Sequence, residues 1–202
     1  MKILYITNAE AENKLEIPSF LESKGNKVEI VTRRFCVQDL INQRIDFIVS
    51  DKTRFLLGKE ILDYLPNKII NLHPSFLPWG RGYHPNFWSI AKNFPHGVTI
   101  HKIDEGIDTG EIIAQSRFSY FSHETFRDTY YRQRKYMVDL FRTFWNDSQG
   151  LEIKSFPQDK QSGNLFYRKD IEPQMIYLKS GWDTRIIDFF SIRQEYTKIK
   201  QD

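Results

Sequence analysis

"IDFIVSDKTRFLLGKEILDYLPNKIINLH", residues 45–73, contains two apolar runs separated by a segment of helical character. The runs IDFIVS, from Ile45, and KIINLH, from Lys68, are typical of strands that are buried on both faces of a sheet. Residues 54–65 between them are predicted to form a helix. A strand, a helix and a strand in this order indicate a βαβ unit, in which the two strands run parallel.

The same alternation continues on both sides of this stretch. Further strands are expected at residues 2–7, 27–31, 97–103 and 111–120, and helices at residues 18–24, 37–43, 84–92, 122–146 and 184–192. Apolar strands that alternate with helices are typical of an α/β fold, so we predict a Rossmann-like, mostly parallel sheet with helices on both faces. Residues 1–148 are expected to form this domain, and residues 149–202, where the pattern loosens, a small C-terminal extension.

The composition is that of a folded domain with many aromatic residues. Of 202 residues, 40% are hydrophobic and 15% aromatic, so one domain with a modest extension is expected to fold. The net charge of +3 is too small and scattered to argue by itself for a nucleic-acid partner, and it would suit a small anionic ligand equally well. Cys36 has no second cysteine to pair with, and the N-terminal apolar stretch is too short for a signal peptide or a membrane span. We therefore expect a cytoplasmic enzyme or binding domain with no nucleic-acid or membrane partner.

Two polar side chains stand at the carboxyl end of the strand that begins at Lys68. Residues two apart in an extended chain point to the same side, so Asn71 and His73 share one face. Pro74 cannot donate a ladder hydrogen bond and restricts His73 to extended geometry, so the strand ends there and the pair is held rigidly. Taken alone, such a pair is more often a turn cap beside a structural histidine.

Three further residues near the predicted strand ends are candidates for binding. Lys52 and Arg54, beyond the strand that begins at Ile45, could meet a phosphate or lie in a solvated loop. Tyr83 is a weaker candidate for ligand contact. The aromatic residues Phe87 and Trp88 are expected to pack instead.

The sequence argues against a metal site and against the common nucleotide motifs. Its five histidines show no HExxH or HxH spacing, so no metal is expected, and His101, in the middle of a predicted strand, is expected to be structural. After the first strand the sequence reads ITNAEAEN, which has no glycine-rich phosphate loop. The fold class itself suggests a ligand at the carboxyl ends of the strands.

Four motifs then follow one another at short spacings. They are NLHPSFLP from Asn71, RG at residues 81–82, GVTIH from Gly97 and DEGIDTGEII from Asp104. Together they resemble the formyltransferase family that uses N10-formyltetrahydrofolate, which includes methionyl-tRNA formyltransferase, glycinamide ribonucleotide transformylase and the sugar N-formyltransferases. The resemblance is strong over residues 45–121 and weak elsewhere. It implies that N10-formyltetrahydrofolate is the cosubstrate.

The resemblance also implies which residues act. In this family an asparagine, a histidine two residues later and an aspartate in a D-x-G loop form the catalytic trio, and these match Asn71, His73 and Asp108. The amide of Asn71 can donate to the oxyanion that forms when an amine attacks the formyl carbon. His73 suits a general base near neutral pH, and Asp108 can orient its ring or join the proton relay, so the first proton acceptor is left open. The residues expected to lie against the folate are Asp104, Gly106 and Ile107.

Two segments, LPWGRGYHPNFW from Leu77 and the later FYRKDIE, most resemble the sugar N-formyltransferases. That resemblance implies a nucleotide-linked amino sugar as acceptor, first of all dTDP-4-amino-4,6-dideoxyglucose for a bacterial surface polysaccharide, with a 3-amino isomer or a GDP-linked 4-amino sugar close behind. The expected substrate contacts are Lys52, Arg54 and Tyr83. The alternatives are an acceptor like glycinamide ribonucleotide or tRNA, and a catalytically silent binding module of the same fold.

Residues 149–202 are expected to act as a dimerisation motif. About fifty residues with few regular elements can hardly bury a core of their own. They nevertheless include the apolar residues Phe156, Phe166, Tyr167, Met175, Ile176 and Tyr177. By resemblance to the sugar N-formyltransferases, part of this segment should pair with a second subunit, so a homodimer is expected.

Overall fold

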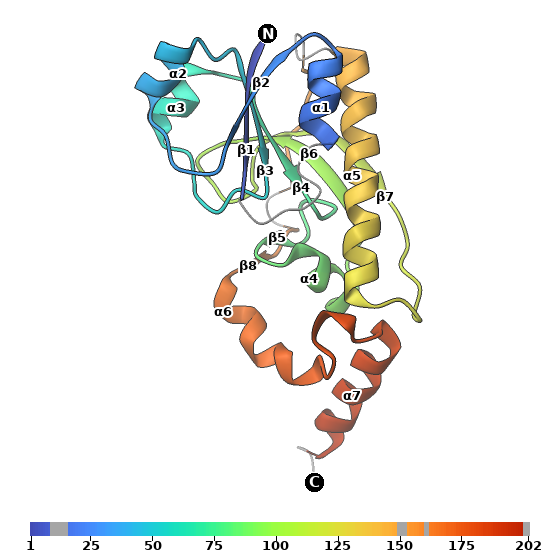
Figure 1. Cartoon of the computed structure of the whole chain (residues 1–202). Coiled ribbons are helices and arrows are strands. Elements are labelled where there is room, and N and C mark those ends of the chain that lie inside the picture. Colours follow the sequence, from blue (N-terminus) through green and yellow to red (C-terminus); the bar gives the residue numbers. More distant parts are fainter. Residues whose placement is uncertain (9–15, 149–152, 160–161, 200–202) are drawn as a thin grey trace.

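The computed structural model describes residues 1–8, 16–148, 153–159 and 162–199. Its main sheet has six strands in the order β2-β1-β3-β4-β6-β7 (Figure 1). The parallel strands are β1 (Lys2–Thr7), β2 (Lys27–Val31), β3 (Phe47–Asp51) and β4 (Ile69–His73), whereas β6 (Gly97–Lys102) runs antiparallel to β4 and β7 (Ile112–Arg117) antiparallel to β6. The predicted mostly parallel α/β sheet is confirmed.

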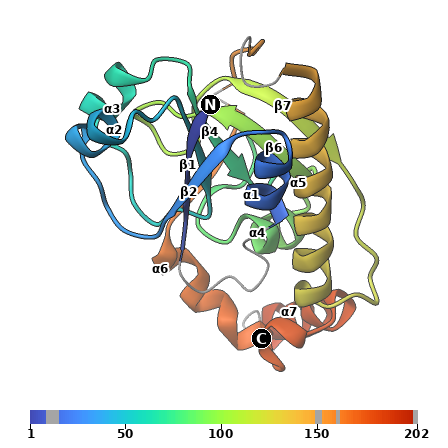
Figure 2. The same ribbon diagram turned by 45° about the horizontal axis from the view of Figure 1, so that its top comes forward.

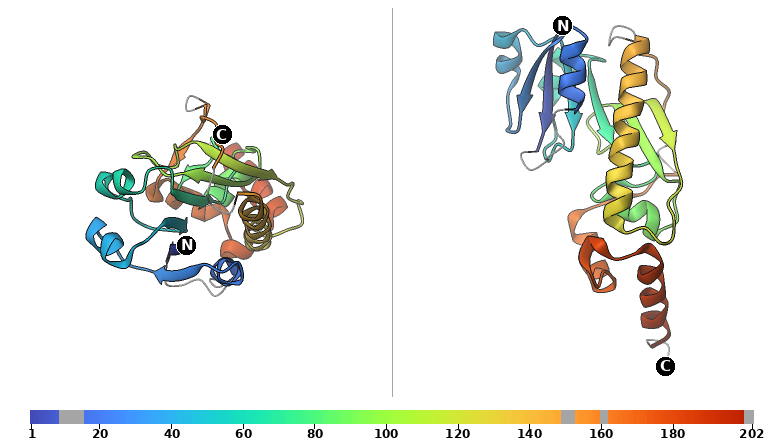
Figure 3. Two further views of the ribbon diagram at one scale, coloured as in Figure 1. Left: turned by 90° about the horizontal axis from the view of Figure 1, so that it is seen from above. Right: turned by 45° about the vertical axis from the view of Figure 1, so that its right-hand side comes forward.

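Helices cover both faces of this sheet, as predicted. One face carries α1 (Glu16–Ser23) and α5 (Phe126–Ser148), and the other carries α2 (Val37–Gln43) and α3 (Lys59–Tyr64) (Figures 1 and 3). The strands are buried on both sides because alternate side chains enter different cores: Ile3 and Tyr5 pack toward α5, and Leu4 and Ile6 toward α2 and α3. No helix in the described part of the chain is both long and apolar enough to cross a membrane.

Two predicted helices near the strand ends begin later than expected. The helix predicted over residues 54–65 is wrong in its first half, because Gly58 is extended and α3 starts only at Lys59. Residues 54–58 instead form a loop, in which the Leu56 side chain is 60% exposed. The helix predicted from residue 122 starts at Phe126, behind a capping box in which Thr125 and Asp128 bind each other's backbone amides. The first correction leaves a loop at the carboxyl end of β3, where a site can form.

The C-terminal extension has more regular structure than expected. It contains β8 (Leu165–Phe166), α6 (Arg168–Ile171), the 3₁₀ helices η1 (Glu172–Tyr177) and η2 (Gly181–Asp183), and α7 (Ile186–Ile199). These elements lie beside α4 (Pro85–Ala91) and the N-terminal end of α5, away from α2 and α3 (Figures 1 and 2). An aromatic cluster joins them to the domain, in which Phe189 of α7 packs on Phe87 and Phe126. The expected boundary between residues 148 and 149 falls at residues 149–152, outside the described residues.

A buried ion pair fixes α5 to the carboxyl ends of two strands. Arg134 of α5 donates to Asp51 Oδ2 at 2.6 Å, and the Tyr5 hydroxyl donates to the same oxygen. Burial and the neighbouring Asp51 raise the pKa of Tyr5, so it stays a donor at neutral pH. Lys52 follows directly in a left-handed conformation (φ 62°), with its Nζ 5.0 Å from the centre of the Tyr130 ring. The network therefore fixes the direction in which the loop after β3 leaves the strand.

A two-residue sheet ties the extension to the loop after β4. β5 (Arg81–Gly82) pairs in parallel with β8, and the amide of Tyr83 donates to the Phe166 carbonyl at 2.8 Å. Gly82 has φ 85°, and a Cβ there would lie 2.2 Å from the Phe166 oxygen. Only glycine combines that conformation with so close an approach of the two chains.

We predict that Gly82→Ala separates β5 from β8. Gly25 provides the matched control, because it has a similar φ of 80° but no atom within 4 Å of an added Cβ. Gly25→Ala should cost only the left-handed strain, about 1–2 kcal/mol of unfolding free energy. Gly82→Ala should cost clearly more and should speed amide exchange at Tyr83, measured by thermal unfolding and hydrogen exchange. Equal losses of stability with unchanged exchange would contradict the tight pairing.

Candidate active site

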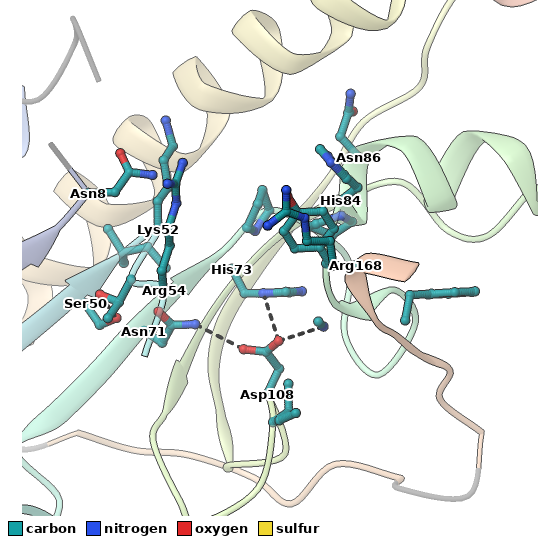
Figure 4. Close-up of a pocket in the computed structure, with 18 of the residues that line it drawn as sticks. Asn8, Ser50, Lys52, Arg54, Asn71, His73, His84, Asn86, Asp108 and Arg168 are labelled. Carbon is teal, nitrogen blue, oxygen red and sulfur yellow. Dashed lines mark hydrogen bonds and ion pairs between the residues drawn. The ribbon is translucent and has the colours of Figure 1, made fainter. Parts of the chain in front are cut away.

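A cavity of about 1030 Å³ opens at the carboxyl ends of β3 and β4 (Figure 4). Its wall is assembled from distant parts of the chain, which are the loops after β3, β5 and β6, the N-terminal half of α5, and the extension around β8 and η2. A ligand at the carboxyl ends of parallel strands is the usual arrangement in open α/β sheets. The cavity therefore lies where the fold class predicts a site.

Asn71, His73 and Asp108 meet on the floor of this cavity. Asn71 Nδ2 donates to Asp108 Oδ1 at 3.3 Å, and His73 Nδ1 lies 3.5 Å from Asp108 Oδ2 (Figure 4). The amide of Gly82 also donates to Asp108 Oδ2, at 2.8 Å. The structure thus brings together the three residues that the sequence placed in the catalytic trio, and it adds a backbone donor.

Local structure explains how Asp108 reaches the strand end. The Asp104 carboxylate accepts hydrogen bonds from the Gly106 amide at 3.1 Å and from the Thr109 hydroxyl at 2.6 Å, which closes the turn. Asp108 itself has φ 53°, a left-handed conformation that is uncommon for a residue with a Cβ. The turn and this conformation together direct the carboxylate back toward β4.

His101 also belongs to this group, although the sequence suggested a structural role. It lies opposite Asn71 across the antiparallel pair of β4 and β6. Its Nε2 is 3.1 Å from Asn71 Nδ2 and 3.5 Å from Asp108 Oδ1, while its Nδ1 is 2.7 Å from the Lys102 carbonyl oxygen. Only the register between two strands thirty residues apart reveals this contact, and a single sequence does not specify that register.

The electrostatics favour an ionised carboxylate beside a neutral imidazole. Burial lowers the pKa of His73, although Asp108 and the hydrogen bond with the Gly80 carbonyl act in the opposite direction. Burial would raise the pKa of Asp108, but His73, His101 and the Gly82 amide together hold it below its usual value. At neutral pH the pair can therefore accept a proton, which is the chemistry of a general base.

The same atoms raise the question of a metal. Within the described ranges, His73, His101 and Asp108 offer ligand atoms that all lie within 4.8 Å of one another. However, Asn71 Nδ2 lies within 3.3 Å of both His101 Nε2 and Asp108 Oδ1, so an amide donor already serves these two acceptors. The arrangement suits proton transfer and oxyanion binding better than metal ligation, and the expected absence of a metal stays a prediction.

The other predicted site residues also reach the cavity. The wall includes the expected folate contacts, Asp104, Gly106 and Ile107, and the expected substrate contacts, Lys52, Arg54 and Tyr83. Phe87 and Trp88 are buried, with side chains 1% and 3% exposed, as expected for packing residues. The substrate set belongs to the loops after β3 and β5, whereas the folate set belongs to the loop after β6, which also carries Asp108.

Several residues in the wall were not predicted, and three of them lie where the extension meets the cavity. Arg168, the first residue of α6, lies in the cavity near His84 (Figure 4), and Trp182 of η2 lines the cavity with its ring centre 4.9 Å from that of His84. The FYRKDIE segment was a signal for Arg168, because it places a cation within a stretch that resembles the sugar N-formyltransferases. Nothing local to the sequence indicated Trp182, since its position depends on the aromatic cluster that docks the extension.

Comparison with known proteins identifies relatives of the whole chain. A family model described as formyl transferase matches residues 7–142. The formyltransferase PseJ from Anoxybacillus kamchatkensis, solved in complex with UDP-4,6-dideoxy-4-formamido-L-AltNAc and tetrahydrofolate, is 36% identical with a TM-score of 0.86, and the match covers 94% of this chain and 97% of that one. A 4-N formyltransferase from Francisella tularensis has the same fold, with 24% identity, a TM-score of 0.74, and coverage of 86% and 78%.

Curated relatives match a shorter part. The dTDP-4-amino-4,6-dideoxyglucose formyltransferase of Mycobacterium tuberculosis is 29% identical over 136 residues, which are 65% of this chain and 55% of that protein. The phosphoribosylglycinamide formyltransferase of Bacillus subtilis is 33% identical over 126 residues, or 59% of this chain and 61% of that protein. The chain thus spans little more than half the length of the curated relatives it matches.

Proposed function

The chain belongs to the formyl transferase family, and we propose that it transfers a formyl group from N10-formyltetrahydrofolate to the amino group of a nucleotide-linked amino sugar. The observation that carries the proposal is the convergence of Asn71, His73 and Asp108 at the strand ends, on the floor of a cavity of about 1030 Å³. Further support comes from PseJ, which was solved with both a nucleotide-linked formamido sugar and tetrahydrofolate.

The proposed chemistry assigns each member of the trio a step. N10-formyltetrahydrofolate supplies the formyl carbon. When the sugar amine attacks this carbon, the carbonyl oxygen becomes an oxyanion and the amine becomes an ammonium. Asn71 Nδ2 turns one hydrogen from Asp108 Oδ1, which lies 3.3 Å away, to the oxyanion, and one such donor is worth about 3 kcal/mol of transition-state stabilisation. His73 takes the ammonium proton, Asp108 stabilises the resulting imidazolium, and the proton leaves with N10 when the carbon–N10 bond breaks.

One side of the cavity fits the flat ring of a folate. Phe55, Leu56 and Leu57 line it, and Ile103 and Ile107 lie in the wall formed by the loop after β6. An apolar slot beside a few polar groups is typical of sites for such rings. The predicted folate contacts, Asp104, Gly106 and Ile107, belong to this side, so we propose that the pterin lies there.

The cavity wall also carries cations suited to the diphosphate of a sugar nucleotide. Arg168 at the start of α6 and Lys52 after β3 both line the cavity, and Tyr83, 40% exposed, lies in the loop after β5. Phosphate oxygens require charge-assisted donors of this kind. We therefore keep Lys52, Arg54 and Tyr83 as proposed substrate contacts and add Arg168.

The comparisons favour a particular class of sugar. The ligand of PseJ and the substrate in the name of the Mycobacterium relative share a 4-amino-derived nitrogen, a 6-deoxy carbon and a pyrimidine nucleotide. We propose a pyrimidine-nucleotide-linked 4-amino-4,6-dideoxy sugar, with UDP ahead of dTDP because PseJ matches 94% of this chain. The sequence-based choice of dTDP-4-amino-4,6-dideoxyglucose, its use in a bacterial surface polysaccharide, and a cytoplasmic location without nucleic-acid or membrane partners stay predictions.

We predict formylation of UDP- or dTDP-linked 4-amino-4,6-dideoxy sugars. The assay incubates the protein and N10-formyltetrahydrofolate with each of these, with a dTDP-linked 3-amino sugar, with a GDP-linked 4-amino sugar and with glycinamide ribonucleotide, and detects added formyl by mass spectrometry. The UDP-linked sugar should give the highest kcat/KM. A preference for glycinamide ribonucleotide would overturn the acceptor class, and binding of the sugars without any product would indicate a silent binding module.

We also predict that His73→Asn and Asp108→Ala each lower kcat by roughly 10²–10⁴-fold while the protein remains folded. Because burial lowers the pKa of His73, the base form persists below its usual pKa, so the acidic limb of the kcat/KM profile should lie below about pH 6.5. His123→Asn, an exposed histidine outside the cavity wall, is the control and should keep normal kinetics. Near-normal turnover of either trio variant would remove the mechanism.

We propose that residues 149–202 form a C-terminal extension that also pairs two copies of the chain. Its exposed apolar side chains include Met175 at 43%, Ile176 at 50% and Ile187 at 48%, a set that a second copy would cover. We predict a dimeric mass by light scattering, and a shift toward the monomer on Ile176→Glu. A monomeric wild-type protein at micromolar concentration would exclude this role.

A further inference from the structure

The extension contributes a strand-like contact beside the trio. Residues 153–159 run antiparallel to the start of β7, and Ile112 and Phe156 exchange both backbone hydrogen bonds, at 2.8 and 2.9 Å. The Ser155 hydroxyl donates to Glu111 Oε2 at 2.6 Å. An antiparallel register from Ile112 and Phe156 brings Gln158 opposite Gly110, next to the loop that carries Asp108.

Gln158 continues this pairing with its side chain. Its Nε2 donates to the Gly110 carbonyl at 2.5 Å and to the Asp108 carbonyl at 3.1 Å. The side chain is 9% exposed, and its Oε1 has no partner among the described residues. Both hydrogens of the Gln158 amide therefore bind carbonyls of this loop. These two bonds set the orientation of the amide, because its oxygen has no partner in the described part of the chain that would do so.

The Asp108 loop depends on being held from outside. Asp108 has the uncommon left-handed φ of 53°, and its carboxylate must lie between His73 and His101, 3.5 Å from each. On the inner side the loop rests on β6, since a Cβ on Gly110 would lie 1.8 Å from the Lys102 oxygen. Gln158 closes the outer side by binding the backbone of Asp108 itself.

We propose that Gln158 is a positioning residue for Asp108, so that residues 153–159 are part of the active site in addition to any role in dimerisation. The proposal rests on formyl transfer at the trio. In that reaction Gln158 touches no reacting atom. Its two hydrogen bonds hold the backbone of the loop, and the Asp108 side chain extends from that backbone to His73. A structural role alone would affect stability, whereas a positioning role also changes the electrostatics of His73.

The electrostatic effect has a definite sign. The described titratable groups that face His73 are Asp108, which raises its pKa, and His101, which lowers it, while the Gly80 carbonyl accepts from its ring. If the carboxylate moves away, its contribution that raises the pKa is lost, while the lowering by burial and the smaller raising by the Gly80 hydrogen bond remain. Loss of Gln158 should therefore lower the pKa of His73 further.

Gln158→Met in the full chain tests the proposal, because methionine has a similar length and no donor. Gln115→Met is the matched control: the Gln115 amide also donates twice, to the Leu77 carbonyl at 2.8 Å and to Thr99 Oγ1 at 3.0 Å, but makes neither bond to the loop that carries Asp108. Both variants should lose some thermal stability. Only Gln158→Met should lower kcat by roughly 10²-fold with little change in KM, and only it should move the acidic limb of kcat/KM to lower pH.

The proposal is overturned if Gln158→Met shows the same kcat and the same acidic limb of kcat/KM as Gln115→Met. If that variant does not fold, Gln158→Asn keeps the amide on a shorter side chain and should show the same changes at smaller size, whereas wild-type kinetics would overturn the proposal. An NMR titration of the His73 imidazole in the ligand-free protein tests the role of Gln158 independently of the proposed reaction. Its pKa should fall in Gln158→Met whether or not any sugar is formylated, and an unchanged pKa would overturn the proposal.

Discussion

A carboxylate that is buried and ionised must be surrounded by donors, because an isolated buried charge is very costly. Asp108 meets this requirement through the side-chain amide of Asn71 in β4 and the backbone amide of Gly82 in β5, while His101 of β6 lies 3.5 Å away and shares the Asn71 donor. Each of these partners belongs to a different element. The Asp108 carboxylate therefore receives all its hydrogen bonds only when the sheet, the loop after β4 and the turn after β6 have folded. The same contacts hold His73 beside a negative charge, which connects the folding requirement directly to the proposed proton transfer.

The sequence predicted those features that depend on local order. Strand periodicity placed Asn71 and His73 on one face, and the alternation of strands and helices predicted a mostly parallel sheet covered on both sides. The helix over residues 54–65 was wrong because the apolar residues of its first half do not pack as a helix but line the cavity wall. Composition and periodicity do not distinguish an apolar loop at a site from the first turn of an amphipathic helix.

The missed site residues depend on contacts between distant segments. His101 reaches Asn71 through a strand register, Gly82 reaches Asp108 through the pairing of β5 with β8, and Arg168 reaches the cavity because the extension docks on an aromatic cluster. Neither of the two strand pairings follows from the neighbours of a residue in one sequence, and for Arg168 only the family resemblance of the FYRKDIE segment gave a signal. The family resemblance identified the trio, since motif spacing carries information about such contacts that periodicity lacks.

The pairing of β5 with β8 has a consequence for how the protein is made. Residues 81–82 leave the ribosome long before residues 165–166, because more than eighty residues separate the two strands in the chain. During synthesis the sheet and α5 can fold while the loop after β4 still lacks its neighbour, as N-terminal regions generally fold first. The cavity wall is therefore completed only after residues 165–166 have emerged. A nascent chain that already holds the trio has an open site until β8 pairs with β5, so the proposed site is assembled more than eighty residues after the loop that follows β4 has been made.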